Sequence, residues 1–187
     1  MTNRDKLLDA TFIEVYKHGY SGASTAAILK SAKVPKGSMY HHFSSKKELV
    51  LGMVKERLIP KVRESFYIEL HETSRAVDIL NYLFKKISKN EMLVKHGCPL
   101  HKLMFEMGTL DDEITELCHN EFVFLTDNLT LILDLGKQNA EIIEKDSKSL
   151  AEFIIISSWG ALSRSPNHSS KEQFLKDTKH IMDYIKI

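Results

Sequence analysis

The sequence predicts an all-α protein of about nine helices, and three observations indicate this. Wherever the 187-residue chain has a clear apolar pattern, hydrophobic residues recur every three or four positions, as on one helix face. No segment alternates apolar and polar residues as a half-buried strand does. Helix-start signals, Ser45 with Glu48 and Ser170 with Gln173, precede two of the periodic segments. We expect an N-terminal three-helix domain at 1–45 and a helical body at 46–187.

The first helix is expected over residues 3–18. Its buried face is predicted to consist of Leu8, Phe12, Val15 and Tyr16, which share one side of a helix. Gly19 should end this helix, because glycine is the usual residue just past a helix C-terminus.

Residues 24–43 are typical of two short helices joined by a tight turn. Ser24 can cap the first helix by accepting from free backbone N–H groups. Lys33 and Val34 then form the turn. Pro35 fits the first position of the second helix, where its missing N–H is not needed.

The second short helix carries groups suited to binding DNA. A cation, a glycine that permits close backbone approach and three hydrogen-bonding side chains follow one another: Lys36, Gly37, Ser38, Tyr40 and His41. Met39 and Phe43 remain to pack inward. Tyr40 could instead be a core aromatic, but the inward phase of the helix is already filled, so we expect it to be exposed. For His42, packing or capping against the next helix fits equally well.

A longer helix should begin at the Ser45–Glu48 capping box, and Pro60 should kink or break it. Apolar stripes then predict the helices of the body. These are a helix with Ala76, Leu80, Leu83, Phe84 and Ile87; a short one at 99–107; a long one from Ile114 through Leu133, begun by Asp111–Glu113 and ended by Gly136; one over Leu150–Leu162, capped by Asp146 or Ser147; and one with Phe174, Thr178, Ile181, Met182 and Ile185. The loop Ser163–Ser170 joins the last two as an antiparallel pair.

Charge is distributed unevenly along the chain, whose net charge is +1. Through Pro60 there are 10 Lys and Arg against 5 Asp and Glu, and beyond it 16 against 20. A basic head attracts DNA phosphates, and an acidic body keeps the rest of the protein off the duplex. The same asymmetry would also arise from an ordinary solvated surface.

Several protein classes are excluded. The charged opening MTNRDKLLDATF does not fit a signal peptide, and no apolar run is long enough to cross a bilayer, so we expect a cytoplasmic protein without a membrane partner. Two cysteines do not make a disulfide framework. There is no Gly-rich phosphate loop, nucleophile elbow or His-Glu-x-x-His zinc pair, so neither an enzyme nor a cofactor is expected.

The segment 24–43 resembles the helix-turn-helix of TetR/AcrR-family transcriptional regulators, with Gly19-Tyr20 before it and Ser45–Leu49 after it. The departures from the family pattern are Ala23 for Thr, Leu29 for a small residue, Lys33 for Gly and Pro35 for Ser. Because glycine adopts a positive φ more easily than lysine, backbone strain is expected at the turn residue Lys33.

The resemblance implies a homodimer that places two recognition helices in the major groove of a palindromic operator and releases it when the body senses an effector. Repression is the commoner mode in the family. By the same resemblance Lys36, Gly37, Ser38, Tyr40 and His41 lie on or near the groove. Thr25 and Lys46 occupy positions that meet phosphates.

The last two helices of the body are the expected dimer interface, as in the resembling family. Its predicted residues are Phe153, Ile156, Trp159, Phe174, Ile181 and Met182. The helix over 150–162 is apolar on nearly all sides, so more than one neighbour must bury it. A core helix buried within a single chain is the alternative.

The effector is expected to be a small molecule or an electrophile of unknown identity. Residues that could line its cavity, or equally form plain core, are Tyr82, Met92, Met104, Phe105, Phe122 and Trp159. Cys98 precedes the helix start at Pro99 and has two lysines and two histidines nearby, which favours a reactive thiolate and a redox sensor. A small, buried and unreactive cysteine is the other interpretation.

A metal site is not expected. Cys98 and His101 could share a helix face, but Cys118 and His119 are adjacent on a helix and point about 100° apart, so four ligands converge poorly. A different class of function stays open, namely a helical adaptor that binds another protein and carries a non-functional DNA head.

Overall fold

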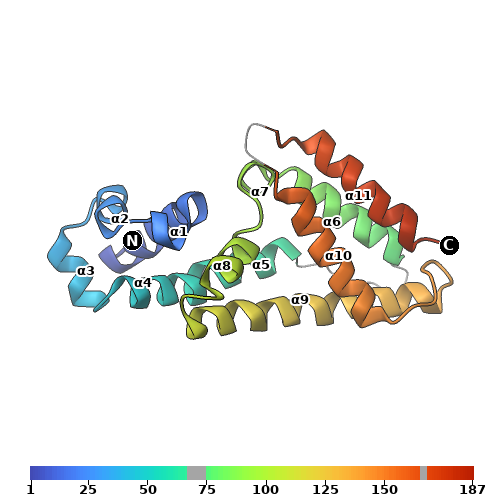
Figure 1. The fold of residues 1–187 in the computed structure, drawn as a ribbon, viewed down its shortest axis with the longest axis horizontal. Helices are drawn as coiled ribbons and strands as arrows, with labels where there is room; N and C mark the ends of the chain where they lie inside the picture. The colour runs from blue at the N-terminus through green and yellow to red at the C-terminus, as the bar shows by residue number, and fades with distance from the viewer. Residues whose placement is uncertain (67–74, 165–167) are drawn as a thin grey trace. The chain divides into compact units, whose positions relative to one another are not determined.

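The computed structural model describes residues 1–66, 75–164 and 168–187. The regular secondary structure of these residues is helical, and their only β contact is an isolated antiparallel bridge between Ile142 and Lys186. The helices are α1 (Asn3–Gly22), α2 (Thr25–Ala32), α3 (Lys36–His42), α4 (Lys46–Met53), a π-helical turn (Val54–Leu58), α5 (Ile59–Phe66), α6 (Ala76–Ser88), α7 (Glu91–His96), α8 (Pro99–Met107), α9 (Asp112–Gln138), α10 (Ser147–Leu162) and α11 (Lys171–Ile185) (Figure 1). The all-α prediction is confirmed, and the count of about nine depends on whether pieces such as α4, the π turn and α5 are taken as one helix.

The helices form two compact units. The first comprises residues 1–64 and 99–121, and the second comprises 65–98 and 122–187. The compact N-terminal unit therefore includes more of the chain than the three-helix domain expected at 1–45. That boundary remains a functional prediction, because compactness alone does not say which residues bind DNA.

In the N-terminal unit, α1 is the central helix and packs against α2, α3, α4 and α8. Its core contains completely buried side chains from four of these elements: Leu7, Leu8, Ile28, Met39 and Leu49. Of the predicted face of α1, Leu8, Val15 and Tyr16 are buried, whereas Phe12 is half-buried beneath Lys61, whose Nζ lies 5.5 Å from the ring centroid.

Most predicted helix ends of this unit are confirmed. Gly19 has φ 75° and breaks the helix as expected, although one further turn carries α1 to Gly22. The hydroxyl of Ser45 accepts from the N–H of Glu48, but the Glu48 carboxylate accepts from Ser44 rather than completing the predicted box with Ser45. Pro35 is the residue before α3, with extended ψ of 147°, and not its first helical residue.

Of the two outcomes expected at Pro60, a kink or a break, the break does not occur, because helical residues continue past it to Phe66. Pro60 has no N–H to bond the carbonyl of Glu56, one turn earlier. The helix widens into a π turn just before the proline, where the N–H of Ile59 bonds the carbonyl of Val54. Arg57 Nη1 donates to the Glu56 carbonyl at 3.1 Å, so that acceptor is still satisfied.

In the second unit, α6 and α10 both pack against α11, and α7 packs against α6 and α10 (Figure 1). Phe84 and Phe174 meet edge to face with centroids 6.4 Å apart. The predicted stripes of α6 and α11 are buried throughout. The starts of α8 at Pro99 and of α11 after Ser170 are also confirmed, and Asp146 is the residue that caps α10.

One expectation for the body is wrong, and one helix was not expected. Gly136 does not end α9, which runs to Gln138; a Cβ at position 136 would lie 2.4 Å from Ile142 and 2.6 Å from Ala76, so this glycine serves close packing. Ala140, at φ 54°, follows the helix end instead. The short helix α7 was not expected, although Asn90 caps it and is a recognisable start signal. Part of the predicted loop 163–170 lies outside the described residues.

Among the described residues, none of the helices combines the length and the apolar character needed to span a membrane.

Candidate nucleic-acid interface

The two short helices α2 and α3 form as the sequence predicts. The hydroxyl of Ser24 accepts from the N–H of Ala27 at 3.1 Å and so caps α2. Lys33 ends α2 in the left-handed conformation, at φ 54° and ψ 44°, which confirms the positive φ expected there. Met39 and Phe43 are 0% and 6% exposed, so they anchor α3 in the core and fix which of its faces points outward.

The outward face of α3 carries most of the residues predicted to bind DNA. Tyr40 is 52% exposed, and Lys36, Gly37 and His41 are exposed as well. Lys36 Nζ lies 6.0 Å from the centroid of the Tyr40 ring, so the cation and the phenol occupy one patch. A Cβ built on Gly37 would meet nothing within 4 Å, so the packing of the chain itself does not require glycine there.

The remaining predicted residues lie differently. Ser38 is half-buried, and its hydroxyl accepts from Asn3 Nδ2 at 3.2 Å, which ties the recognition helix to the start of α1. Thr25 is half-buried at the first position of α2. His42 is exposed rather than packed, with its ring beside those of His41 and Phe43.

Lys46 does not present its ammonium as a free phosphate contact. Its Nζ donates to the carbonyl of Tyr20 at 2.5 Å and lies 4.5 Å from the centroid of the Tyr20 ring. Burial lowers the pKa of Lys46, and the charge of Glu106 partly offsets that effect. Reaching a phosphate would require this lysine to leave its present partners.

Exposed lysines add positive charge around α3. Lys30 and Lys33 lie on α2 and its C-terminal end, and Lys36 begins α3. None of the three forms an ion pair with another described residue, so their charge is available to an anionic partner.

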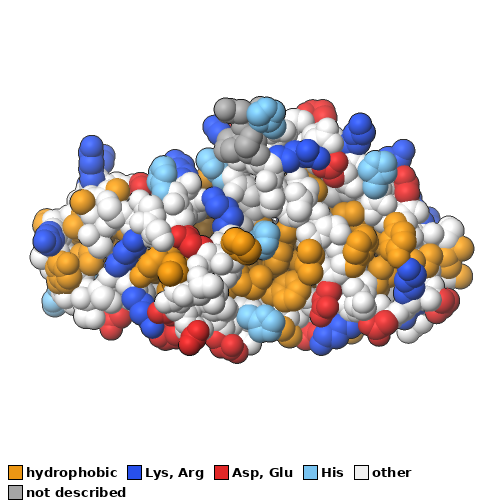
Figure 2. Space-filling view, in the orientation of Figure 1, with side chains coloured by type: hydrophobic (Ala, Val, Ile, Leu, Met, Phe, Trp, Pro, Cys, Tyr) orange, Lys and Arg blue, Asp and Glu red, His pale blue; other side chains and the backbone are white. Residues whose placement is uncertain are grey.

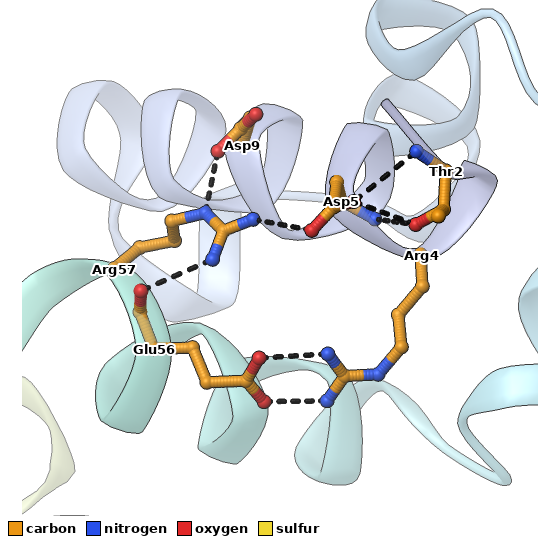
Figure 3. A network of polar contacts seen from close by, with 6 residues as sticks. All are labelled: Thr2, Arg4, Asp5, Asp9, Glu56 and Arg57. Atoms are coloured by element: carbon orange, nitrogen blue, oxygen red, sulfur yellow. Dashed lines mark hydrogen bonds and ion pairs between the residues drawn. The ribbon is translucent and has the colours of Figure 1, made fainter.

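A network of ion pairs that the sequence did not predict joins the start of α1 to the π turn (Figure 3). Arg4 makes two parallel bonds to the Glu56 carboxylate, at 2.7 and 2.5 Å, while its guanidinium lies 5.3 Å from the Phe43 ring centroid. Arg57 bonds Asp9 at 2.6 Å and Asp5 at 2.9 Å. The start of α1 and the π turn are therefore joined by charge-assisted bonds.

The same network shifts the pKa values of its members. Hydrogen bonds from the side chain and backbone of Thr2, and from Arg57, lower the pKa of Asp5 to about 2. The hydrogen bond from Arg4 lowers the pKa of Glu56, and the bond to Asp9 raises that of Arg57. All of these groups are therefore charged near neutral pH.

The residues expected to line a cavity are scattered. Tyr82 and Phe105 are 57% and 83% exposed, which does not suit the lining of an enclosed cavity, and Met92 and Met104 are half-buried. Phe122 and Trp159 do meet, in the second unit, with ring centroids 5.4 Å apart. Of the six, this pair alone is joined by a ring contact in the described structure.

Burial divides the residues expected at the dimer interface into two groups. Four of them lie in the core of their own chain and are at most 7% exposed: Trp159, Phe174, Ile181 and Met182. Phe153 and Ile156 are 44% and 57% exposed on α10, and Figure 2 shows hydrophobic side chains on the surface over α10 and beside the end of α11.

The cysteines are both buried and unbridged, and Cys98 is 6% exposed. In the part of the chain that the structure describes, no group of three His, Cys, Asp or Glu side chains is placed to hold a metal ion.

Comparison with known proteins agrees with this arrangement. Residues 7–53 match the model for bacterial regulatory proteins of the tetR family. The chain is 30% identical over 165 residues to the HTH-type transcriptional repressor DhaR of Mycobacterium sp. (strain GP1), covering 85% of this chain and 81% of that protein. It is 28% identical over 114 residues to an uncharacterized HTH-type transcriptional regulator of Lactococcus lactis, covering 59% of this chain and little more than half, 57%, of that relative.

A solved TetR-family regulator from Agrobacterium tumefaciens has the same fold, with a TM-score of 0.88, 20% sequence identity and coverage of 99% of this chain and 98% of that one. The matched segment 7–53 contains α2 and α3 with their exposed lysines and Tyr40. The chain thus belongs to the TetR family of DNA-binding transcriptional regulators.

Proposed function

We propose that this protein is a repressor that binds a palindromic operator as a homodimer and releases it when an effector binds the C-terminal unit. One observation carries the proposal. Helix α3 exposes Lys36, Tyr40 and His41 on one side while Met39 and Phe43 anchor its other side, which is how a recognition helix meets a major groove. The DNA-binding domain is residues 1–45, and the body is 46–187.

Homodimerisation is supported by the surface of α10. Phe153, Ile156 and Gly160 are exposed at helical spacing along one side of this helix, and a Cβ at Gly160 would meet nothing within 4 Å. The Phe153 ring lies 5.4 Å from that of Tyr184 on α11, which extends the apolar surface to the last helix. Such a face suits close contact with the same face of a second copy.

Repression is supported by the relative DhaR, which is named a transcriptional repressor. For the effector we favour a small molecule that binds without reacting over an electrophile. Cys98 is only 6% exposed, and an electrophile must reach the thiol that senses it. The contact of Phe122 with Trp159 marks the aromatic part of the second unit where an apolar ligand would be held.

Selection from random duplexes tests the DNA-binding proposal. Purified protein should enrich a palindrome whose half-sites are about 34–36 Å apart, or a multiple of this distance. A protein-binding adaptor with a non-functional head, or an enzyme, would enrich no sequence, and that result would overturn the proposal.

The recognition residues can be tested on the selected operator. Lys36→Ala and Tyr40→Ala should each weaken binding by about tenfold or more, since each removes a contact worth about 1–3 kcal/mol. Lys36→Ala should also reduce the salt dependence by about two counterions per bound dimer, one for each head. Lys17→Ala removes an exposed lysine of α1 and is the matched control. Gel-shift titrations in which both recognition variants bind like wild type, with unchanged circular dichroism, would refute the assignment.

A further inference from the structure

The connection between α1 and α2 is held by a carboxylate from a distant part of the chain. Because Gly19 breaks α1, the N–H groups of the next turn lack the carbonyl partners that a continuous helix would supply. Glu106 of α8 takes them instead: Oε2 accepts from Tyr20 N at 2.6 Å and Oε1 accepts from Ser21 N at 2.8 Å. Glu106 thus caps this turn from 85 residues away in sequence.

Glycine is needed at position 19 for two reasons. Its φ of 75° is one that other residues adopt at a cost. A Cβ there would also lie 2.6 Å from Glu106 Oε2 and 3.2 Å from Cδ, which is too close for the carboxylate to stay in place. The backbone break and the carboxylate therefore depend on the same missing side chain.

Two lysines complete the arrangement. Lys102 lies one turn before Glu106 on α8 and donates to the carbonyl of Tyr16 at 2.8 Å, while Lys46 donates to the carbonyl of Tyr20. Burial acts to raise the pKa of Glu106, but the backbone hydrogen bonds from Ser21 and Tyr20 outweigh it and leave this pKa lowered. The end of α1 is thus bonded by the carboxylate of Glu106 and the ammonium groups of Lys46 and Lys102. We call these three side chains the clamp.

The clamp bonds the turn that lies directly before the helix-turn-helix. The clamped turn ends two residues before Ser24, which caps α2, so its position sets where the helix-turn-helix begins. The segment 99–121, which contains α8, belongs to the N-terminal unit yet is joined at both of its ends to residues of the second unit.

We propose that Glu106 is a positioning residue for operator recognition: it sets the placement of the helix-turn-helix by clamping the turn at Tyr20 and Ser21. This inference rests on the proposed DNA-binding function. It gives Lys46 a place in the clamp, where its Nζ donates to the carbonyl of Tyr20.

Glu106→Gln is the decisive variant, because it keeps the size of the side chain but replaces one acceptor oxygen with an NH₂ group that cannot accept. The matched control is Glu113→Gln, which removes the same charge from an exposed carboxylate in the same unit. Hydrogen exchange in the full-length protein without DNA should accelerate by about tenfold or more at the Tyr20 or Ser21 amide of Glu106→Gln. Exchange at these amides should be unchanged in the control.

The second measurement separates positioning from simple structural support. At a temperature where circular dichroism shows both variants fully folded, Glu106→Gln should bind the selected operator about tenfold more weakly. It should also tolerate half-site spacings one base pair longer or shorter better than wild type does. A merely structural role would lower the unfolding temperature and leave the spacing preference as it was.

Three results are decisive. Unchanged exchange at both amides in Glu106→Gln would show that the carboxylate does not hold this turn. Faster exchange with wild-type affinity and spacing preference would show that the clamp does not position the head. If wild-type protein selects no duplex, the proposed function fails, and the use of the clamp for recognition fails with it, whereas selection by the wild type together with an unaltered variant overturns the clamp alone.

Discussion

Gly37 is a residue whose identity the fold of its own chain does not demand. It is exposed near the start of α3, and a side chain there would extend into open space. Gly37→Ala should therefore leave the free energy of unfolding unchanged or raise it by up to about 1 kcal/mol, because alanine favours the helix. Operator affinity should nevertheless fall about tenfold, since the added methyl group blocks the close approach of the backbone to DNA.

Gel-shift titration together with urea unfolding checks this prediction. A variant that is as stable as wild type but binds DNA equally well would show that glycine at position 37 is incidental.

Lys33 has a strained backbone conformation in the folded protein. A lysine with φ 54° is strained relative to glycine in the same left-handed conformation. Lys33→Gly should raise the free energy of unfolding by about 1 kcal/mol. Lys30→Gly, inside α2 and on the same short helix, should lower it by about as much, because glycine weakens a helix interior. Urea midpoints of the two variants that move in the same direction would contradict this account.

At the level of single residues, the sequence predicted burial and exposure correctly where these depend on residues nearby in the chain. The inward Met39 and Phe43 and the exposed Tyr40 follow from spacing within a few turns. The positive φ of Lys33 was expected from the glycine that the resembling family has at this position. Lys46 and Glu106 could not be placed, because the groups they bond lie 26 and 86 residues away in sequence. Residues that look free in a linear motif can be engaged by another helix.

At the level of elements, most helix starts were predicted, the start of α7 being an exception, and some helix ends were not. A cap such as Ser24, Asp146 or Ser170 is a local event, because its oxygen bonds an N–H three residues on. Gly136 was expected to end a helix, but α9 continues past it to Gln138. Pro60 was expected to kink or break a helix, and the helix continues past it after a π turn. Gly136 instead allows close packing of Ile142 and Ala76, and the Glu56 carbonyl, which cannot bond an N–H of Pro60, accepts from Arg57.

The bonds between α1 and the π turn predict a specific sensitivity to acid. The pKa of Asp5 in the folded protein is about 2, against an ordinary value of 3.8. Because the folded state lowers this pKa, the stabilisation is present above the unfolded value and is lost as the pH falls from about 4 through about 2. Asp5→Asn should lack this part of the pH dependence while its unfolding temperature at neutral pH falls only modestly.

Thermal unfolding of both proteins between pH 6 and pH 2 measures the effect. Asp78→Asn is the control, because Asp78 is exposed and its nearest ion-pair contact is 4.0 Å away. Curves of equal slope for wild type and Asp5→Asn below pH 4 would contradict the assignment.

For the whole molecule, the sequence predicted the family and the class of fold, whereas the dimer interface stays a prediction. The helix over 150–162 is apolar on nearly all sides, and periodicity alone cannot say which side a neighbouring chain covers. In the structure Trp159 faces its own core, whereas Phe153 and Ile156 remain at the surface. From this burial we propose the α10 face with Phe153, Ile156 and Gly160 as the interface.

Ile156→Glu tests this interface and its consequence for DNA binding. Ile156 is 57% exposed, so a carboxylate is solvated in the monomer and costs the fold little, but it would be desolvated and opposed by its own copy across a two-fold contact. Sedimentation should show a monomer. Leu131→Glu, at an equally apolar and 63% exposed site on α9, should remain a dimer.

The monomeric variant should also lose operator affinity far beyond twofold, because two linked heads bind the second half-site at a high effective concentration and separate heads do not. Retained dimerisation by Ile156→Glu would move the interface away from α10. Retained operator affinity in a proven monomer would instead show that one DNA-binding domain is enough for full affinity. Dimerisation would then not explain a palindromic operator.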